Sequence, residues 1–247
     1  MHLTGRQLLI TGVLLLAASV AAPNRGLAVE LDIDLLATQA QFRALGDEAG
    51  LALGYPQAAP AEALGFPGFD VGIEATVTPI DSDNIYWQLA FSGDPPDYLP
   101  VPRLRARVAL PFGIDVGAVY AKIPYIVAGM IGGEIKWSVI KGGVAMPAVA
   151  VRGAYSTLLN VDELGLTSYS ADVSVSKGFL IFTPYLGVGQ VWTEAEDKST
   201  PPNFNTERHS NTRMFVGLQI GIPLIRFTAE AAFAEVQSYT ARLSAGF

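Results

Sequence analysis

Three arginines stand at alternate positions in the stretch RLRARVAL, residues 103 to 110. Arg103, Arg105 and Arg107 share one parity, and the residues between them are apolar. Alternate side chains of a β-strand point to the same face, so this spacing places three guanidinium groups on one side of a sheet. A guanidinium suits carboxylate or phosphate because it binds them in a bidentate geometry. The stripe therefore predicts a surface that holds or guides anions.

Other charged residues occupy the polar parity of their own alternating segments. The acidic members are Asp70, Glu74, Asp115, Glu134, Asp172 and Glu230. The basic members beside the stripe are Lys136, Arg152, Arg213, Arg226 and Arg242. Buried charges must be paired or solvated. Two interpretations stay open: a face closed by cross-strand ion pairs, and a pore or pocket in which the arginines guide an anionic group.

The elements that carry these residues alternate with a period of two from residue 69 to the end. The ten segments are 69–78, 101–110, 112–122, 128–139, 142–157, 164–177, 179–194, 209–222, 224–234 and 237–247. Most run ten residues or more, which suits a tilted strand that crosses a bilayer better than a strand of a soluble sandwich. Short turns mostly alternate with longer polar loops, as in outer-membrane barrels.

The fold predicted over residues 69–247 is thus all-β: a closed antiparallel transmembrane β-barrel of about ten strands. Its apolar face meets lipid and its charged face lines the lumen, because arginine on the lipid side costs about 2–4 kcal/mol at the midplane. Segment 84–91, NIYWQLAF, is interpreted as part of a long extracellular connection, since bacterial single-chain barrels have even strand numbers. Twelve strands is the alternative.

The N-terminal part divides into an export signal and a helical segment. Residues 1–28 combine Arg6, an apolar run and small residues before a cleavage site after about Ala28, which is typical of a signal peptide. An uncleaved anchor is the alternative. Residues 29–68 contain a predicted helix over 34–53, with Asp34 as N-cap and Gly54 as stop, and a Pro-rich linker over 55–68. Phe42, Leu45 and Ala49 are candidates for a plug inside the lumen.

Composition excludes several classes of function. The chain has no cysteine, so thiolate metal sites and disulfides are absent, and no cofactor motif or metal site is predicted. A net charge of −7 argues against nucleic-acid binding. His209 is the sole weak catalytic candidate, for a hydrolase at the barrel rim, and Ser210 beside it would face the other side of a regular strand.

The C-terminal stretch SYTARLSAGF, which ends in Phe247, resembles the signature by which outer-membrane proteins engage the barrel-assembly machinery. The chain is similar in this respect to the Gram-negative outer-membrane β-barrel superfamily. GFDVGIEATVT, PDYLPVPRLRARVALPFGIDVG and VSVSKGFLIFTPYLGVG resemble an uncharacterised family of exported barrels. The helix followed by GFDVGIEATV is weakly similar to outer-membrane long-chain fatty-acid transporters, which are larger.

Location and partners follow from that resemblance and from the two-faced strands. We expect the protein in the cell outer membrane, in contact with its lipids and, during biogenesis, with the assembly machinery. The expected function is passage or binding of a small amphipathic or hydrophobic molecule. The alternatives are a closed structural or docking barrel of the envelope and a lipid-directed rim hydrolase.

Overall fold

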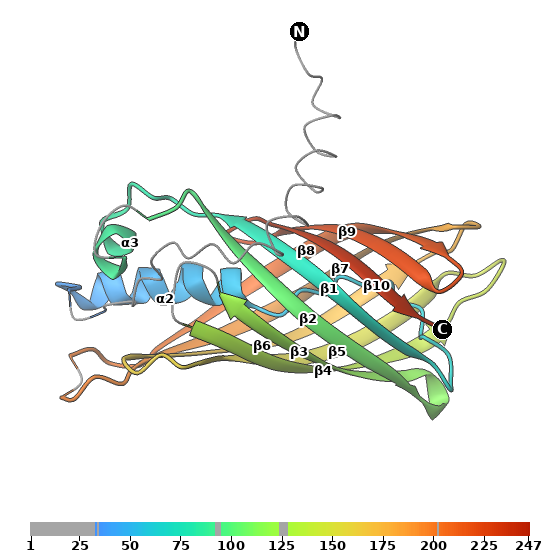
Figure 1. Cartoon of the computed structure of the whole chain (residues 1–247), viewed down its shortest axis with the longest axis horizontal. Helices are drawn as coiled ribbons and strands as arrows, with labels where there is room; N and C mark the ends of the chain where they lie inside the picture. The colour runs from blue at the N-terminus through green and yellow to red at the C-terminus, as the bar shows by residue number, and fades with distance from the viewer. Residues whose placement is uncertain (1–32, 34, 92–94, 124–127, 202) are drawn as a thin grey trace, which may run out of the picture.

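Ten antiparallel strands form a closed barrel in the computed structural model (Figure 1), which describes residues 33, 35–91, 95–123, 128–201 and 203–247. The strands are β1 (Phe69–Pro79), β2 (Tyr98–Leu110), β3 (Ile114–Ile123), β4 (Ala128–Lys141), β5 (Ala148–Leu159), β6 (Leu164–Ser176), β7 (Phe182–Asp197), β8 (Glu207–Ile222), β9 (Ile225–Phe233) and β10 (Ser238–Gly246). Each pairs with its neighbour in the chain, and β1 pairs with β10 to close the sheet. The predicted fold and strand number are confirmed.

The predicted segments match the observed strands closely, with the largest difference at the start of β5. The expected strand over 142–157 begins at Ala148, because residues 142–147 form the turn after β4. Segment 84–91 contains the short helix α3 (Ile85–Ala90), so it adds no strand to the barrel. A one-turn 3₁₀ helix (Pro111–Gly113) joins β2 to β3.

Helix α2 (Gln39–Leu53) is shorter than the predicted helix over 34–53. It begins after Thr38, whose hydroxyl accepts a hydrogen bond from the Gln41 backbone N–H, while the Gln41 side chain caps the Thr38 N–H in return. This reciprocal capping box fixes the start of the helix. The predicted N-cap, Asp34, lies outside the described residues. Gly54 ends the helix as predicted. Among the described residues, every helix is too short or too polar to cross a bilayer.

The outside of the barrel is apolar and the inside is polar, because the side chains of each strand alternate. Val71, Ile73, Leu104 and Val108 are 44–54% exposed, whereas Arg105 and Asp70 on the opposite parity are fully buried. This pattern on a closed antiparallel sheet is the architecture of Gram-negative outer-membrane barrels. The protein is therefore placed in the outer membrane, as predicted.

The two ends of the barrel differ. The loop end carries α3 and the longer connections, and the turn end carries the short turns and Phe247 (Figure 1). Longer loops of outer-membrane barrels are extracellular and short turns periplasmic. Helix α2 lies at the loop end, beside α3, β6, β7 and β8. The linker (residues 55–68) then runs through the lumen to β1 at the turn end.

This path settles where the N-terminal helix lies. The sequence predicts a plug inside the lumen; α2 occupies the mouth at the loop end, and the linker is the part that lies deep inside. The predicted signal peptide, residues 1–28, lies outside the described residues and stays a prediction.

Candidate functional site

The arginine stripe of β2 points inward and contacts the backbone of the linker. Arg105 is fully buried and donates to the carbonyl oxygens of Pro56 at 2.5 Å and Gln57 at 3.1 Å, and to the Tyr55 hydroxyl at 3.1 Å. Its guanidinium also lies 3.1 Å from the Glu74 carboxylate, on β1. Its Nε lies 3.9 Å from the Glu134 carboxylate, so its charge is shared between two carboxylates and the linker.

A second arginine group surrounds Asp172 of β6. Arg152 lies 2.5 Å and Arg213 2.9 Å from the two oxygens of this carboxylate. Arg152 also pairs with Glu134 at 3.1 Å and donates to the carbonyl oxygens of Tyr55 and Pro56. Arg213 donates to the same Tyr55 carbonyl oxygen at 3.4 Å. Ionic pairs and linker contacts therefore belong to one network.

A third group lies nearer the turn end, around the fully buried carboxylate of Asp70. Arg107 lies 3.2 Å and Arg226 3.1 Å from its oxygens, and Arg242 forms an ion pair with it. Arg242 donates in addition to the carbonyl oxygen of Ala58. Asp70 thus gathers three cations, one of which also reaches the linker.

Lys136 donates hydrogen bonds to the linker backbone, and Glu230 accepts one from it. Lys136 Nζ pairs with Asp115 at 3.1 Å and donates to the carbonyl oxygens of Pro60 and Glu62. Glu230 accepts from the Ala58 backbone N–H at 2.8 Å and from the Tyr185 hydroxyl at 2.8 Å.

These contacts explain why cations outnumber carboxylates in the lumen. The N–H groups of these cations that form no ion pair donate to backbone carbonyl oxygens of the linker. Every predicted lumen-lining residue lies on the inner face: Glu74, Arg103, Arg105, Arg107, Glu134, Lys136, Asp172, Arg213, Arg226, Glu230 and Arg242. Both the ion-pair and the anion-guiding interpretations overlooked the linker as an acceptor.

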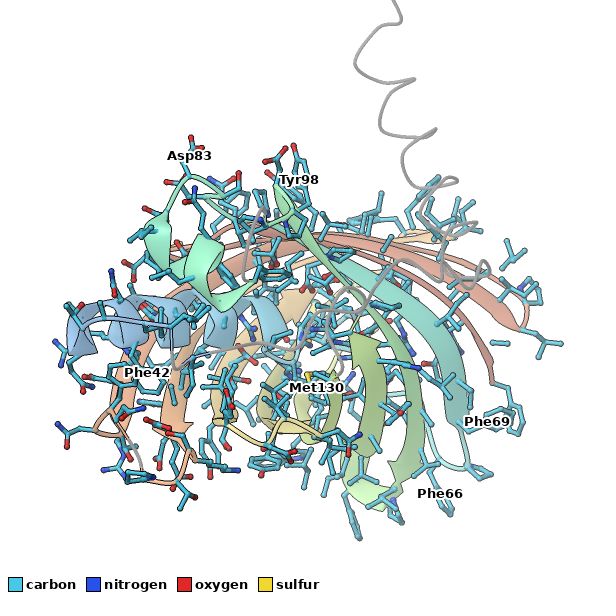
Figure 2. The ribbon with its side chains drawn as sticks, turned by 60° about the vertical axis from the view of Figure 1, so that its left-hand side comes forward. Phe42, Phe66, Phe69, Asp83, Tyr98 and Met130 are labelled. Atoms are coloured by element: carbon cyan, nitrogen blue, oxygen red, sulfur yellow. The ribbon has the colours of Figure 1, made fainter. Side chains whose placement is uncertain are left out.

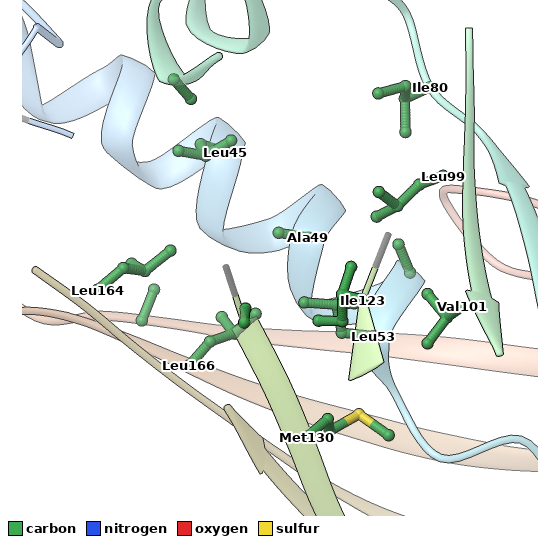
Figure 3. Close-up of a cluster of buried hydrophobic side chains, with 14 of the residues drawn as sticks. Leu45, Ala49, Leu53, Ile80, Leu99, Val101, Ile123, Met130, Leu164 and Leu166 are labelled. Carbon is green, nitrogen blue, oxygen red and sulfur yellow. The ribbon is translucent and has the colours of Figure 1, made fainter. Parts of the chain in front are cut away.

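The luminal wall changes character near the loop end, where inward residues become apolar. Leu99 and Val101 of β2, Ile123 of β3, Met130 of β4 and Leu166 of β6 are at most 3% exposed. Figure 3 shows them around the apolar face of α2. We call this wall the apolar mouth. It is unusual, because lumens of such barrels are polar.

The three predicted plug residues lie in this mouth. Leu45 and Ala49 pack in its buried cluster, and the Phe42 ring stacks on Phe204 with centroids 5.1 Å apart. Gly46 and Gly50 face β7, where a side chain at Gly46 would lie 2.7 Å from the Ala195 Cβ. The glycines let α2 approach the strand closely. Sequence reasoning missed them because glycine within a helix is an ambiguous signal.

Polar contacts hold the outer side of α2 to the rim. Asp47 accepts from Asn211 at 2.6 Å and lies 3.7 Å from His209 Nδ1. The hydrogen bond and negative charge of Asp47 raise the pKa of the Glu235 carboxyl in the β9–β10 turn. Glu48 accepts a hydrogen bond from Trp87 Nε1, and the buried Trp87 side chain packs under α2.

The rim-hydrolase alternative gains no nucleophile from Ser210, although Asp47 lies near His209. His209 faces α2, whereas Ser210 faces outward and pairs with Gln190 at 2.6 Å. Among the described residues, no group of three or more His, Asp or Glu side chains is arranged to hold a metal ion.

Two small cavities lie beside the C-terminal end of α2 and the start of the linker. One cavity lies beside Gly50, Met130 and Leu166, and another beside Gly54, Thr76 and Arg213. Each offers about 10 Å³, which is close to the space of a single water molecule.

No family model and no curated protein matches the chain. Solved structures similar to it are the KdgM porin (10% identity, 72% of this chain and 99% of that chain covered, TM-score 0.38), Ail of Yersinia pestis with the heparin analogue sucrose octasulfate (14%, 72% and 95%, 0.31) and Neisserial surface protein A (14%, 72% and 94%, 0.31). These are barrel proteins, and at such TM-scores the likeness gives no residue correspondence. The similarity to fatty-acid transporters stays a prediction.

Proposed function

We propose that the protein is a plugged outer-membrane barrel whose apolar mouth takes up a small amphipathic molecule when α2 moves aside. The observation that carries this proposal is the apolar mouth itself. Leu99, Val101 and Met130 form part of a luminal wall that is apolar where such barrels are usually polar. With α2 displaced, that wall becomes a concave apolar surface open to the outside, suited to a hydrocarbon chain.

Arg103 supports an acidic head group on that molecule. It lies below the mouth, one inward position beyond Val101, and donates to Gly54 O at 3.1 Å and to Thr76. Its Nε is buried without a hydrogen-bond partner, and among the described residues no carboxylate lies within 4 Å of it. A carboxylate or phosphate head group would complete its donor set.

The test uses binding of dodecanoate against dodecanol to barrels in vesicles. Trp87, beneath α2, reports the site in a background with Trp137 and Trp192 replaced by Phe. We expect dodecanoate to change its emission, and Arg103→Met to weaken dodecanoate binding by about tenfold or more while dodecanol binding stays the same.

A disulfide crosslink that holds α2 to β8 provides the matched control, and we call it the staple. Because the chain has no cysteine, D47C/N211C places a single thiol pair where native side chains lie 2.6 Å apart. The oxidised staple should abolish the emission change, and reduction should restore it. Equal binding to stapled and reduced protein would instead report partition into lipid and contradict the proposal.

A permanently closed structural barrel is the second candidate, and the dense linker contacts favour it. Single-channel conductance of the intact chain and of a variant without residues 29–60 separates the two. Opening on truncation supports the plug, whereas silence of both proteins supports the closed barrel.

A further inference from the structure

The turn end of the barrel exposes large apolar side chains at the tips of its short turns. Phe112 between β2 and β3 is 82% exposed, Val144 between β4 and β5 and Leu180 between β6 and β7 are fully exposed, and Leu224 between β8 and β9 is 63% exposed. Phe66, at the exit of the linker, is 65% exposed and lies at the opposite end from Asp83 and Phe42 (Figure 2). Exposed apolar clusters of this kind mark interaction surfaces.

The backbone geometry of these turns does not favour large apolar residues. Phe112, Leu180 and Leu224 have φ values of 68°, 55° and 72°, in the left-handed region. Glycine or asparagine adopts this conformation with less strain, and both are the usual choice in tight turns. A large apolar residue at three such positions therefore calls for an apolar contact outside the chain.

The charge of these turns indicates what that contact is. Residues 111–113, 141–147, 177–181 and 223–224 include Lys141 and Lys177 and no acidic residue. Lys177 Nζ donates to the carbonyl oxygens of Gly143, Val144 and Met146, which ties two neighbouring turns together. Apolar tips with a few lysines match an acyl layer edged by phosphates.

The height of the apolar belt gives an independent estimate of where the turn tips lie relative to the membrane. Outward tyrosines mark its upper edge, including Tyr120 and Tyr169, which are 52% and 50% exposed. Eight residues separate Tyr120 from Phe112, and eleven separate Tyr169 from Leu180. At roughly 3.3 Å per residue and a tilt of about 40°, these runs span about 20–28 Å. Both runs end at the tips and are close to the apolar belt of about 25 Å that such barrels carry.

We propose that the apolar turn tips are a membrane-anchoring surface, seated at the boundary of acyl chains and head groups of the periplasmic leaflet. The occupant is phospholipid, because the tips continue the lipid-facing belt without a polar break: Phe69, Phe182, Ile225 and Phe247 flank them on the outer face and are 41–60% exposed. Outward Trp137, level with Ile114 next to the first tip, marks the same interface.

The experiment uses single-cysteine variants labelled with bimane in vesicles that contain brominated phospholipid. Leu180→Cys and Leu224→Cys report the tips, Leu186→Cys on the outer face of β7 reports the belt, and Asp83→Cys reports the loop end. We expect brominated lipid to quench the tips to the same range as position 186, with position 83 unquenched. Aqueous iodide, present inside and outside the vesicles, serves as the opposite probe. If iodide quenches the tips as strongly as position 83, the proposal is overturned, and a periplasmic protein or a second copy is left as the occupant.

A second measurement separates lipid contact from turn strain. L180N/L224N keeps left-handed backbone at lower strain and removes the apolar tips. We expect its urea midpoint in vesicles to fall below that of the native chain, because two anchors are lost. An unchanged or raised midpoint overturns the proposal, since it shows that the leucines contribute nothing beyond strain.

Discussion

Helix α2 and the linker are consecutive in the chain but are held in the barrel in two different ways. The helix fills an apolar mouth through van der Waals contact, two glycines and a few half-exposed polar pairs. The linker is held by buried arginines and a lysine that donate to its carbonyl oxygens. Apolar contact is non-directional and tolerates sliding, whereas charged hydrogen bonds fix a position. The comparison teaches that α2 is the part suited to move.

The largest effect is expected where the linker network is broken. Arg152→Met leaves the buried carboxylates of Asp172 and Glu134 with fewer partners and removes one of the two donors from each of two linker carbonyl oxygens. We expect a loss of about 3–5 kcal/mol in the free energy of unfolding, measured by urea titration in vesicles.

The matched control is the outward pair of Arg208 and Glu194, whose side chains are 75% and 40% exposed. Arg208→Met should lower the free energy of unfolding far less than Arg152→Met does, because an exposed ion pair is screened by solvent and contributes little. Losses of equal size for both variants would show that the buried network has no special role and would remove the contrast between the two regions.

A smaller effect is expected from overpacking the helix. Gly50→Val places methyl groups against Thr193 of β7 and should cost about 1–3 kcal/mol of docking free energy. The linker contacts are untouched, so α2 should become sensitive to protease while the barrel keeps its heat-modifiable mobility on gels. Ala40→Val, at an exposed position of the same helix, is the control. Unfolding of the whole barrel by Gly50→Val would show that the two regions are not separable.

The smallest effect is a pH dependence of helix docking. Asp47 raises the pKa of the Glu235 carboxyl, so the docked state favours its protonated form. The docking free energy that this proton supplies is present at acidic pH and is lost as pH rises through the raised pKa. We therefore expect protease protection of α2 to fall between acidic and neutral pH, and Glu235→Gln to flatten that change. A Gln variant with the native pH profile would assign the dependence to other groups.

Most of the barrel follows from the parity of its residues. Alternation in stretches such as RLRARVAL is a strong signal because one face meets lipid and the other does not, and strand lengths follow from bilayer thickness. The inward position of Arg105 and Asp172 is predictable for the same reason. The partners of these residues are harder to predict, since carbonyl oxygens have no signature in a sequence.

The position of the N-terminal segment was even harder to predict from the sequence. Pro56 and Pro60 indicate an extended linker, because proline lacks an N–H and fixes φ, but they do not show where the linker lies. Gly46 and Gly50 are the features that register α2 against β7, and glycine within a helix is an ambiguous signal. Sequence patterns describe the faces of an element, whereas the pairing of α2 with the mouth depends on contacts between distant parts of the chain.

The linker enters at one rim and leaves at the other immediately before β1, the strand that closes the seam with β10. A helix with its side chains is about 10 Å across, and the middle of the lumen is filled by Arg105, Arg152 and their partners. Late threading of α2 through a finished cylinder would require that network to come apart. We therefore expect biogenesis to wrap the sheet around a linker that is already in place, with the β1–β10 seam sealing last.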